Sequence, residues 1–156
     1  YTSRFLTLTK GTGVINRIFH GYGKFEGEMD GRKNGALISM STGKAVAFAI
    51  FNLQARGEMF VTHNDPVYEG MIVGLTPKPG DMIINVMKGK QLTNMRTQGT
   101  DENVVLTPVR QMSIAEQLSM LNTDEALEIT PKSLRLRKAI LNPHDRKKSE
   151  KSGAAA

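Results

Sequence analysis

The sequence predicts an α+β fold, mostly β-strand with about three helices, and three observations support this prediction. Short apolar runs recur between turns that contain glycine and proline, which is typical of strands. Two segments, residues 41–57 and 113–122, instead place apolar residues at helical spacing. Apolar residues form 39% of the 156-residue chain, so a packed core is expected instead of general disorder.

The first residues of the chain are ambiguous. Residues 3–10 fit either the end of a helix or a strand, because so short a segment does not reveal its period. Residues 14–19, VINRIF, alternate apolar and polar side chains, which predicts a strand. Residues 20–35 contain five glycines in sixteen positions and predict a long loop with a short strand in it. Residues 35–40, GALISM, predict a buried strand.

The segment 41–57 has the clearest helical pattern. Ser41 or Thr42 can cap its N-terminus, and Gly57 can end it at the C-terminus. Four apolar side chains fall on one stripe of this predicted helix: Val46, Ala49, Ile50 and Leu53.

Strands are predicted again in the middle of the chain, over 58–62, 66–75, 81–87 and 103–109. The stretch between the last two, residues 88–102 (KGKQLTNMRTQGTDE), is polar and basic. If the two flanking strands pair, this stretch is the loop of their hairpin. Loops of such length are usually functional or disordered.

Two further helices are predicted near the C-terminus. In 113–122, Ser113 and Glu116 form a capping-box pattern. In 129–141, ITPKSLRLRKAIL, Thr130 is the expected cap, and the proline after it is tolerated in the first helical position.

The net charge of +6 is concentrated in one region. Residues 130–151 hold eight Lys/Arg against two Asp/Glu, whereas the remainder holds thirteen of each sign. Residues 143–156 are therefore predicted to be a disordered basic tail. Polyanions are natural partners of basic segments, although most charge runs are simply solvated surface.

Motifs for catalysis or metal binding are not found in the sequence. TGKA at 42–45 lacks the glycine spacing and the Ser/Thr of a phosphate loop, and GTG at 11–13 lacks the third glycine of a dinucleotide loop. His63 and Asp65 could form an acid/base pair, but HNDP is also favourable turn sequence, and we prefer that interpretation. We therefore predict no catalytic residue, no metal and no small-molecule substrate for this chain. We also predict no membrane partner, because no apolar stretch of about 18 residues is present.

The composition of residues 88–102 suits nucleic acid. Cations neutralise phosphates, while amides and hydroxyls hydrogen-bond phosphate and sugar oxygens. The stretch has no aromatic residue and so offers no base stacking. On composition alone, RNA binding and a solvated loop are equally open.

Four stretches resemble one family: residues 34–57, 58–74, 88–102 and 127–141. They look like the C-terminal region of TypA/BipA, a bacterial family of ribosome-associated translational GTPases. Residues 1–23, YTSRFLTLTKGTGVINRIFHGYG, are similar to the end of the last ferredoxin-like domain (domain V) of elongation factor G, where a helix leads into a final strand.

The resemblance implies a fragment with three regions. Residues 1–25 would be the tail of a ferredoxin-like domain, helix then final strand. Residues 26–142 would be the TypA/BipA-type C-terminal domain, and 143–156 the tail. The family's GTP-binding domain is missing from these regions. GTP and Mg²⁺ are therefore expected for the full-length parent, and no cofactor and no GTP hydrolysis for this chain.

The resemblance also implies partners: the bacterial 70S ribosome, 23S ribosomal RNA and A-site tRNA. The expected setting is cytoplasmic and ribosome-associated, in translation regulation, stress response, virulence regulation or ribosome assembly. The resemblance places residues 88–102 on a loop that contacts the acceptor arm of A-site tRNA. Seven of them are expected to bind RNA: Lys88, Lys90, Gln91, Thr93, Asn94, Arg96 and Thr97.

A second, subordinate set of RNA contacts is expected on the predicted third helix: Lys132, Arg135, Arg137 and Lys138. The alternative for these side chains is packing, with arginine stems covering apolar surface. The alternative for the chain as a whole is a protein-interaction or scaffolding domain without direct RNA contact. Its binding surface would be apolar, and its affinity would change little with salt.

Overall fold

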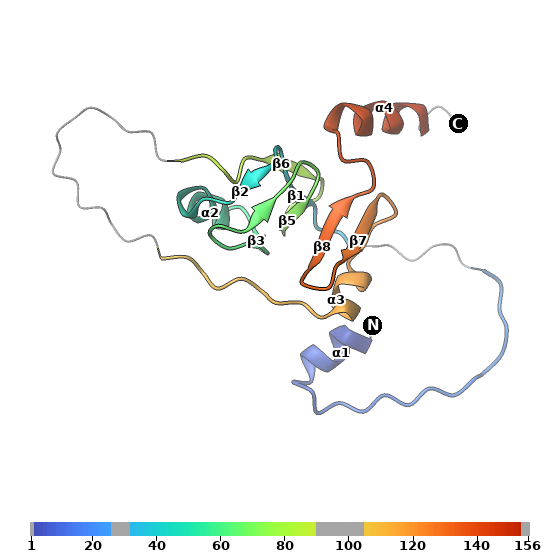
Figure 1. Ribbon diagram of the computed structural model, residues 1–156. Helices are drawn as coiled ribbons and strands as arrows, with labels where there is room; N and C mark the ends of the chain where they lie inside the picture. Colours follow the sequence, from blue (N-terminus) through green and yellow to red (C-terminus); the bar gives the residue numbers. More distant parts are fainter. Residues whose placement is uncertain (1, 26–31, 90–104, 154–156) are drawn as a thin grey trace, which may run out of the picture. The chain divides into compact units, whose positions relative to one another are not determined.

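The computed structural model describes residues 2–25, 32–89 and 105–153, and the chain divides into two compact units, residues 1–30 and 31–156 (Figure 1). The described part of the second unit contains eight strands and three helices. The predicted α+β class, mostly β with about three helices, is therefore confirmed.

In the first unit, helix α1 (Thr2–Leu8) resolves the ambiguity of residues 3–10 in favour of a helix. The helix ends where Lys10 and Gly11 adopt positive φ angles of 52° and 80°. The Thr9 hydroxyl stabilises this end by donating a 2.8 Å hydrogen bond to the carbonyl oxygen of Phe5.

The strand predicted over 14–19 does not form, because residues 14–25 have no hydrogen-bonded strand partner among the described residues. A single extended segment leaves its backbone groups unpaired and its side chains unpacked. Ile18 is accordingly 92% exposed and Tyr22 99% exposed. The expected tail of a ferredoxin-like domain stays a prediction.

In the second unit, the central sheet has four strands in the order β3 (Glu58–Met59), β5 (Ile72–Leu75), β1 (Ala36–Ser39) and β6 (Met82–Ile84). Strand β1 runs antiparallel to β5 and parallel to β6. The strands predicted over 35–40, 58–62 and 81–87 are thus present, although shorter than predicted. The single strand predicted over 66–75 is divided by a turn into β4 (Pro66–Val67) and β5, which belong to different sheets.

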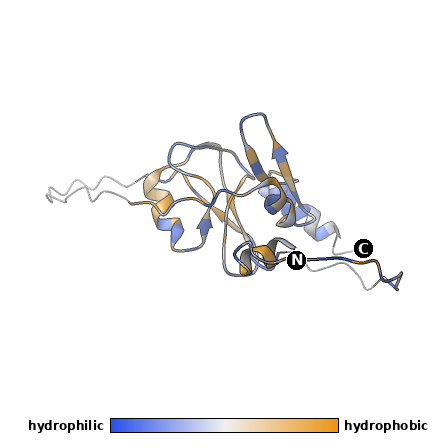
Figure 2. Cartoon of the chain, turned by 90° about the horizontal axis from the view of Figure 1, so that it is seen from below, coloured by the Kyte–Doolittle hydropathy of each residue, from blue (hydrophilic) through white to orange (hydrophobic). Residues whose placement is uncertain are grey.

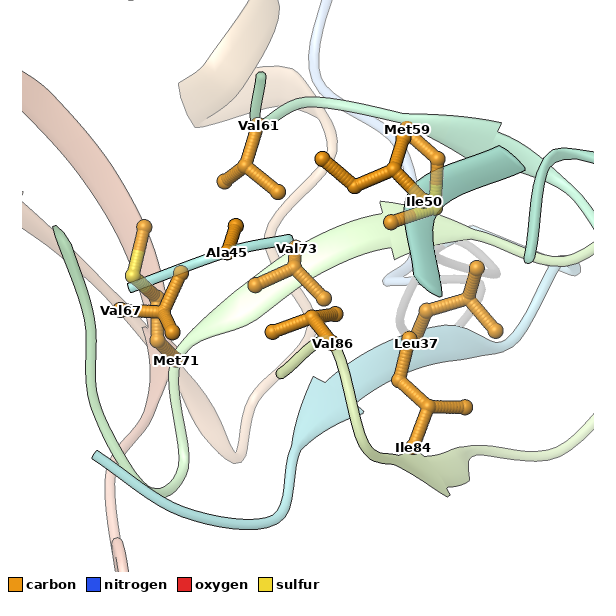
Figure 3. Close-up of a cluster of buried hydrophobic side chains, with 10 residues drawn as sticks. All are labelled: Leu37, Ala45, Ile50, Met59, Val61, Val67, Met71, Val73, Ile84 and Val86. Atoms are coloured by element: carbon orange, nitrogen blue, oxygen red, sulfur yellow. The ribbon is translucent and has the colours of Figure 1, made fainter. Parts of the chain in front are cut away.

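All four residues of β1 are buried, as predicted for 35–40. Three of them are apolar, and the hydroxyl of the fourth, Ser39, donates a 2.9 Å hydrogen bond to the Ser41 carbonyl oxygen. Leu37 points from this strand into the main apolar cluster, where Val73 of β5, Ile84 of β6 and Ile50 converge on it (Figure 3). The cluster contains ten buried residues: Leu37, Ala45, Ile50, Met59, Val61, Val67, Met71, Val73, Ile84 and Val86.

Helix α2 (Ala47–Gln54) is shorter than the helix predicted over 41–57. Residues Gly43–Lys44 form β2, which pairs antiparallel with β4 (Pro66–Val67) and keeps the chain extended before the helix. Neither Ser41 nor Thr42 is the cap: the Thr42 hydroxyl accepts a hydrogen bond from the backbone of Glu69 instead. The predicted stop at Gly57 is also wrong, since Ala55 is the C-cap.

The third predicted helix, over 129–141, is wrong. Residues Glu125–Ile129 and Leu134–Lys138 form an antiparallel hairpin, β7 and β8, with Pro131 and Lys132 in its turn. The alternation of LRLRK explains this outcome, because a strand turns every second residue to the same face. Leu136 and Lys138 are buried, and the arginine between them is not.

Helix α3 (Ile114–Ser119) confirms the capping box predicted for 113–122. The Ser113 hydroxyl accepts from the Glu116 N–H at 3.3 Å, and the Glu116 carboxylate accepts from the Ser113 N–H at 3.0 Å. These two bonds satisfy N–H groups that the first turn of a helix leaves without partners.

The strand predicted over 103–109 is absent from its described part, residues 105–109. The hairpin with 81–87 therefore does not form, and β6 pairs with β1 instead.

The predicted disordered tail also differs: Pro143–Gly153 form helix α4. The Asn142 side chain accepts from the His144 N–H at 2.8 Å, and Pro143 occupies the first helical position. The helix leading to the C-terminus is coloured mostly hydrophilic in Figure 2, so local capping and charge stabilise it more than burial does. None of the described helices has the length and apolar character needed to cross a membrane.

Candidate nucleic-acid interface

The two ends of the predicted RNA-binding loop are held by helix α2. At one end Val86 is fully buried, and its carbonyl oxygen accepts a 2.9 Å hydrogen bond from the N–H of Val46, the N-cap of α2. At the other end the Gln54 amide donates to the Thr107 carbonyl at 3.0 Å and accepts from its N–H at 3.2 Å. Since α2 has eight residues, these attachments are on the order of 12 Å apart along its axis.

Apolar contacts reinforce both attachments, because Met87 and Leu106 pack partly buried against the main cluster. Lys88 follows immediately and is exposed. Of the seven predicted loop residues, Lys88 is the one that the structure describes. The other six lie outside the described residues, and their roles stay predictions: Lys90, Gln91, Thr93, Asn94, Arg96 and Thr97.

The four cations predicted to share a basic helix lie on the hairpin in different environments. Lys132 is exposed in the turn. Arg135 pairs with the Glu128 carboxylate at 3.5 Å, and Arg137 donates to the carbonyl oxygens of Lys138 and Ala139 at 3.2 and 3.4 Å. Lys138 is buried. Of the four, Lys132 is therefore the residue best placed to meet a polyanion, and Lys138 is not accessible to one.

Lys138 instead holds the hairpin to the central sheet. Its side chain is 2% exposed, and its Nζ lies 2.5 Å from Asp81, 2.6 Å from Asp124 and 3.1 Å from Glu125. Asp81 precedes β6, and its other contact is a 2.7 Å hydrogen bond from the N–H of Ala36 in β1. One ammonium group thus links two strands of the sheet to the hairpin.

Arg32 completes this buried charge network. Its guanidinium contacts both carboxylate oxygens of Glu125, at 2.8 and 3.3 Å, and donates to the Met120 carbonyl at 3.2 Å. The two side chains are 7% and 0% exposed. The buried charges, Arg32, Lys138 and Glu125, are therefore paired with one another, which is the condition under which charges are tolerated in a protein interior. The other two carboxylates, Asp81 and Asp124, are 33% and 58% exposed.

The network shifts the pKa values of two of its members, Lys138 and Asp81. Burial lowers the pKa of Lys138, but the carboxylates of Asp124, Asp81 and Glu125 outweigh it, and the pKa is raised above its ordinary value. Burial likewise opposes ionisation of Asp81, but the Ala36 N–H and Lys138 hold its pKa below the ordinary value. Both groups are therefore charged at neutral pH.

Tyr68 makes a second link to the hairpin. Burial, together with a 2.6 Å hydrogen bond to Glu128, raises the pKa of Tyr68 to about 12. We expect Tyr68→Phe to lower the free energy of unfolding by about 1 kcal/mol at neutral pH, the typical net value of one hydrogen bond. The ordinary pKa of tyrosine is 10.0, so this contribution is complete below pH 10 and is lost as the pH rises towards 12.

Urea unfolding of both proteins at pH 7 and pH 11 measures this contribution. The difference in free energy of unfolding between wild type and Tyr68→Phe should be smaller at pH 11 than at pH 7. An equal or larger difference at pH 11 would contradict the stabilising role of the Tyr68–Glu128 hydrogen bond.

His63 and Asp65 act in a turn, as the preferred interpretation of HNDP states. Asp65 accepts a 2.7 Å hydrogen bond from the Thr62 N–H, and Asn64 has a positive φ of 68°. The imidazole of His63 accepts from the N–H of Ala47 at 3.2 Å, which caps helix α2 from a distant part of the sequence. Across residues 2–25, 32–89 and 105–153, no group of three His, Asp or Glu side chains is arranged to hold a metal.

Helix α4 adds cations that the prediction of a disordered tail did not place. Arg146 donates hydrogen bonds to the carbonyl oxygens of Ile140 and Leu141, at 3.0 and 2.6 Å. Lys147 and Lys148 are exposed on the helix. The concentration of positive charge after residue 130 signalled these residues, but not that a helix would order them.

Comparison with known proteins decides the family. Residues 34–143 match the model of the TypA/BipA C-terminal domain.

The chain belongs to the TypA/BipA family.

Three similar proteins share one name. The TypA/BipA chain is 48% identical over 152 residues to the large ribosomal subunit assembly factor BipA of Buchnera aphidicola subsp. Schizaphis graminum, and 45% identical over 152 residues to that of Salmonella typhimurium. The factor of Escherichia coli K12 is 44% identical over 153 residues. Each match covers 97% of this chain and 25% of the relative, so the chain spans about a quarter of the length of these proteins.

Proposed function

We propose that this chain is the C-terminal RNA-docking part of a ribosome-associated TypA/BipA GTPase. It would bind 23S ribosomal RNA and the acceptor arm of A-site tRNA through residues 88–102, in translation regulation, stress response or assembly of the large ribosomal subunit. GTP hydrolysis, with its Mg²⁺, would belong to the rest of the full-length protein. Family membership and the relatives' name support the ribosomal setting.

The observation that carries the proposal is the double attachment of the loop to α2. Val86 is held at the start of the helix and Thr107 at its end, so the described residues on both sides of the cationic stretch are fixed to the packed core. Lys88 is exposed, two residues after Val86, and is the first residue of the cationic stretch 88–102. A fixed base limits the positions that the loop residues reach, which lowers the entropy lost on binding.

We expect the combined substitution of Lys88, Lys90 and Arg96 by alanine to weaken binding to tRNA and to 70S ribosomes. For a single strand, removing one cation that binds a phosphate flattens the plot of log affinity against log salt by roughly 0.7 units. Fluorescence anisotropy across a salt series measures both the affinity and the slope.

A matched control removes the same charge elsewhere: Lys24, Lys44 and Lys78, all exposed, changed to alanine. The control should retain the wild-type slope. An unchanged slope in the loop variant would rule out phosphate binding by these three residues. An equal decrease in affinity in both variants would mean that net charge, not the loop, attracts the RNA.

A further inference from the structure

A groove lies between helix α4 and β6, the strand at one edge of the central sheet. Its lining residues come from four segments: 32–38, 80–83, 122–124 and 143–147. Its volume is about 510 Å³. Residues 86–88 and 106–107, which flank the proposed RNA-binding loop, do not line it. We call it the α4 groove.

Backbone contacts hold α4 beside this groove. Arg146 donates from its guanidinium to the carbonyl oxygens of Ile140 and Leu141, and from its backbone N–H to that of Asn142 at 3.1 Å. The N–H of Ala139, just after β8, bonds the carbonyl oxygen of Asp124 at 2.9 Å. The first turn of α4 is therefore attached to a segment that is itself bonded to the groove wall.

The two carboxylates that line the α4 groove already have a cation. Asp81 and Asp124 lie 2.5 and 2.6 Å from the Nζ of Lys138. Arg32, which also lines the groove, is paired with Glu125 behind it. In this network two cations face three carboxylates, so it contributes one net negative charge to the groove.

Three further cations line the groove: Lys33, Arg146 and Lys147. Lys33 and Lys147 are exposed and make no ion pair with any described residue, and Arg146 contacts carbonyl oxygens instead of a carboxylate. Against the single negative charge of the network, these cations give the groove a net charge of +2. The rest of α4 does not change this value, because Asp145 and Glu150 are matched by two more lysines.

The uncharged lining favours contacts with a nucleic-acid backbone. The side-chain amides of Asn34 and Asn122 line the groove and make no hydrogen bond within the described part of the chain. Amides and cations together suit phosphate and 2′-hydroxyl oxygens. No aromatic residue lines the groove, so it offers no platform for stacking bases.

An acidic polypeptide fits this lining less well. Peptide-binding grooves use apolar pockets as anchors for side chains. Of the two isoleucines that line the α4 groove, Ile38 is buried in the sheet, and Ile83 is 43% exposed. The accessible surface of the groove is therefore mostly polar and cationic.

We propose that the α4 groove binds the sugar–phosphate backbone of double-helical RNA. Lys33 and Lys147 would each contact a phosphate, and Asn34 and Asn122 would bond 2′-hydroxyl or phosphate oxygens. Double-helical RNA is recognised largely through these groups, whereas single strands are held mainly by stacking. The inference rests on the proposed RNA docking for the class of partner, but its residues are separate from 88–102.

The test compares Lys33→Ala/Lys147→Ala with the matched control Lys24→Ala/Lys148→Ala. The control removes the same charge, and Lys148 is next to Lys147 on α4 but does not line the groove. Fluorescence anisotropy with a fully paired RNA hairpin, across a salt series, measures affinity and slope. The groove variant should bind at least about threefold more weakly at physiological salt. Its plot of log affinity against log salt should flatten by roughly 0.9 units for each lost phosphate contact.

The control should retain the wild-type slope. All four lysines are exposed, so thermal unfolding should show both variants to be as stable as wild type. An unchanged slope in the groove variant, or equal flattening in the control, would overturn the proposal. An equal loss of affinity for oligouridylate would assign the groove to single strands instead. Polyglutamate displacing the RNA hairpin at equal charge concentration would assign it to an acidic polypeptide.

Combining the groove variant with the triple-alanine loop variant separates this inference from the proposed function. If both sites bind RNA independently, the flattening of the combined variant should equal that of the two variants added together. A wild-type slope in the loop variant alone would contradict the proposed function and leave the groove contact in place. A wild-type slope in the groove variant alone would do the reverse.

Discussion

Replacing Lys138 by alanine is expected to lower the free energy of unfolding by about 2–3 kcal/mol, less than for a fully buried ion pair, because Asp81 and Asp124 remain 33% and 58% exposed to solvent. Three carboxylates surround its ammonium group, and the side chain of Glu125 is fully buried. Arg32 would remain to neutralise Glu125, but Asp81 would lose its cation. Urea unfolding at neutral pH measures the loss.

Lys78→Ala is the control, because Lys78 is exposed on a turn, and we expect it to change stability by less than about 0.5 kcal/mol. A Lys138→Ala protein within about 1 kcal/mol of wild type would show that the network adds little to stability.

The difference in free energy of unfolding between wild type and Lys138→Ala should depend on pH, because it is electrostatic in origin. The pKa of Asp81 is below its ordinary 3.8 in the fold, so its contribution is present above that pH and lost as the pH falls through the lower folded value. The pKa of Lys138 is above its ordinary 10.5, so its contribution is present below that pH and lost as the pH rises further. The gap between wild type and Lys138→Ala should therefore be flat through neutral pH and narrow in acid.

Gly70→Ala is the second substitution with a large expected effect. Gly70 has a φ of +83°, and a Cβ there would lie 2.7 Å from the Cα of Leu141. The backbone conformation costs an L-residue roughly 1–2 kcal/mol, and forcing an extra methyl against backbone costs roughly 1–3 kcal/mol more. The chain leaves little freedom to relax, because Gly70 bonds Ser39 through its N–H and Lys138 through its carbonyl.

Gly80→Ala separates the two costs, since Gly80 has a φ of +89° but open space around the added Cβ. Thermal and urea unfolding should show both variants destabilised, with Gly70→Ala worse by roughly 1–3 kcal/mol. Equal losses would mean that the contact with Leu141 relaxes at no cost.

The parts of the fold that the sequence predicts are those decided by local pattern. The segment GALISM predicts buried strand β1, and the pair Ser113 and Glu116 predicts the start of α3. Local sequence is sufficient to predict both, although β1 forms its hydrogen bonds with the distant strands β5 and β6.

Distant partners explain the failures. By their sequence, Gly43 and Lys44 fit the start of a helix, but pairing with β4 makes them a strand. Likewise LRLRK is short enough to fit a helix, and the contact of Lys138 with Asp81, which favours the strand, joins distant parts of the sequence. The candidate site divides in the same way. Composition points to residues 88–102 as a cationic loop, but the contact that fixes the residues after it, between Gln54 and Thr107, joins residues 53 positions apart. The groove lined by Phe60, Ile72, Met112 and Leu136 cannot be predicted from the sequence, since four separated segments form it.

The position of Lys138 late in the chain also bears on the order of folding during synthesis. Strands β1, β5 and β6 all precede residue 85, so their sheet can assemble while the hairpin is still being made. Before Lys138 has been synthesised, the carboxylate of Asp81 has no cation to pair with. The sheet formed by β1, β5 and β6 is then less stable than it becomes once the hairpin packs against it. We expect pulsed hydrogen exchange during refolding to protect the amide of Ile38 before that of Lys138, and the reverse order would assign the first step to the hairpin.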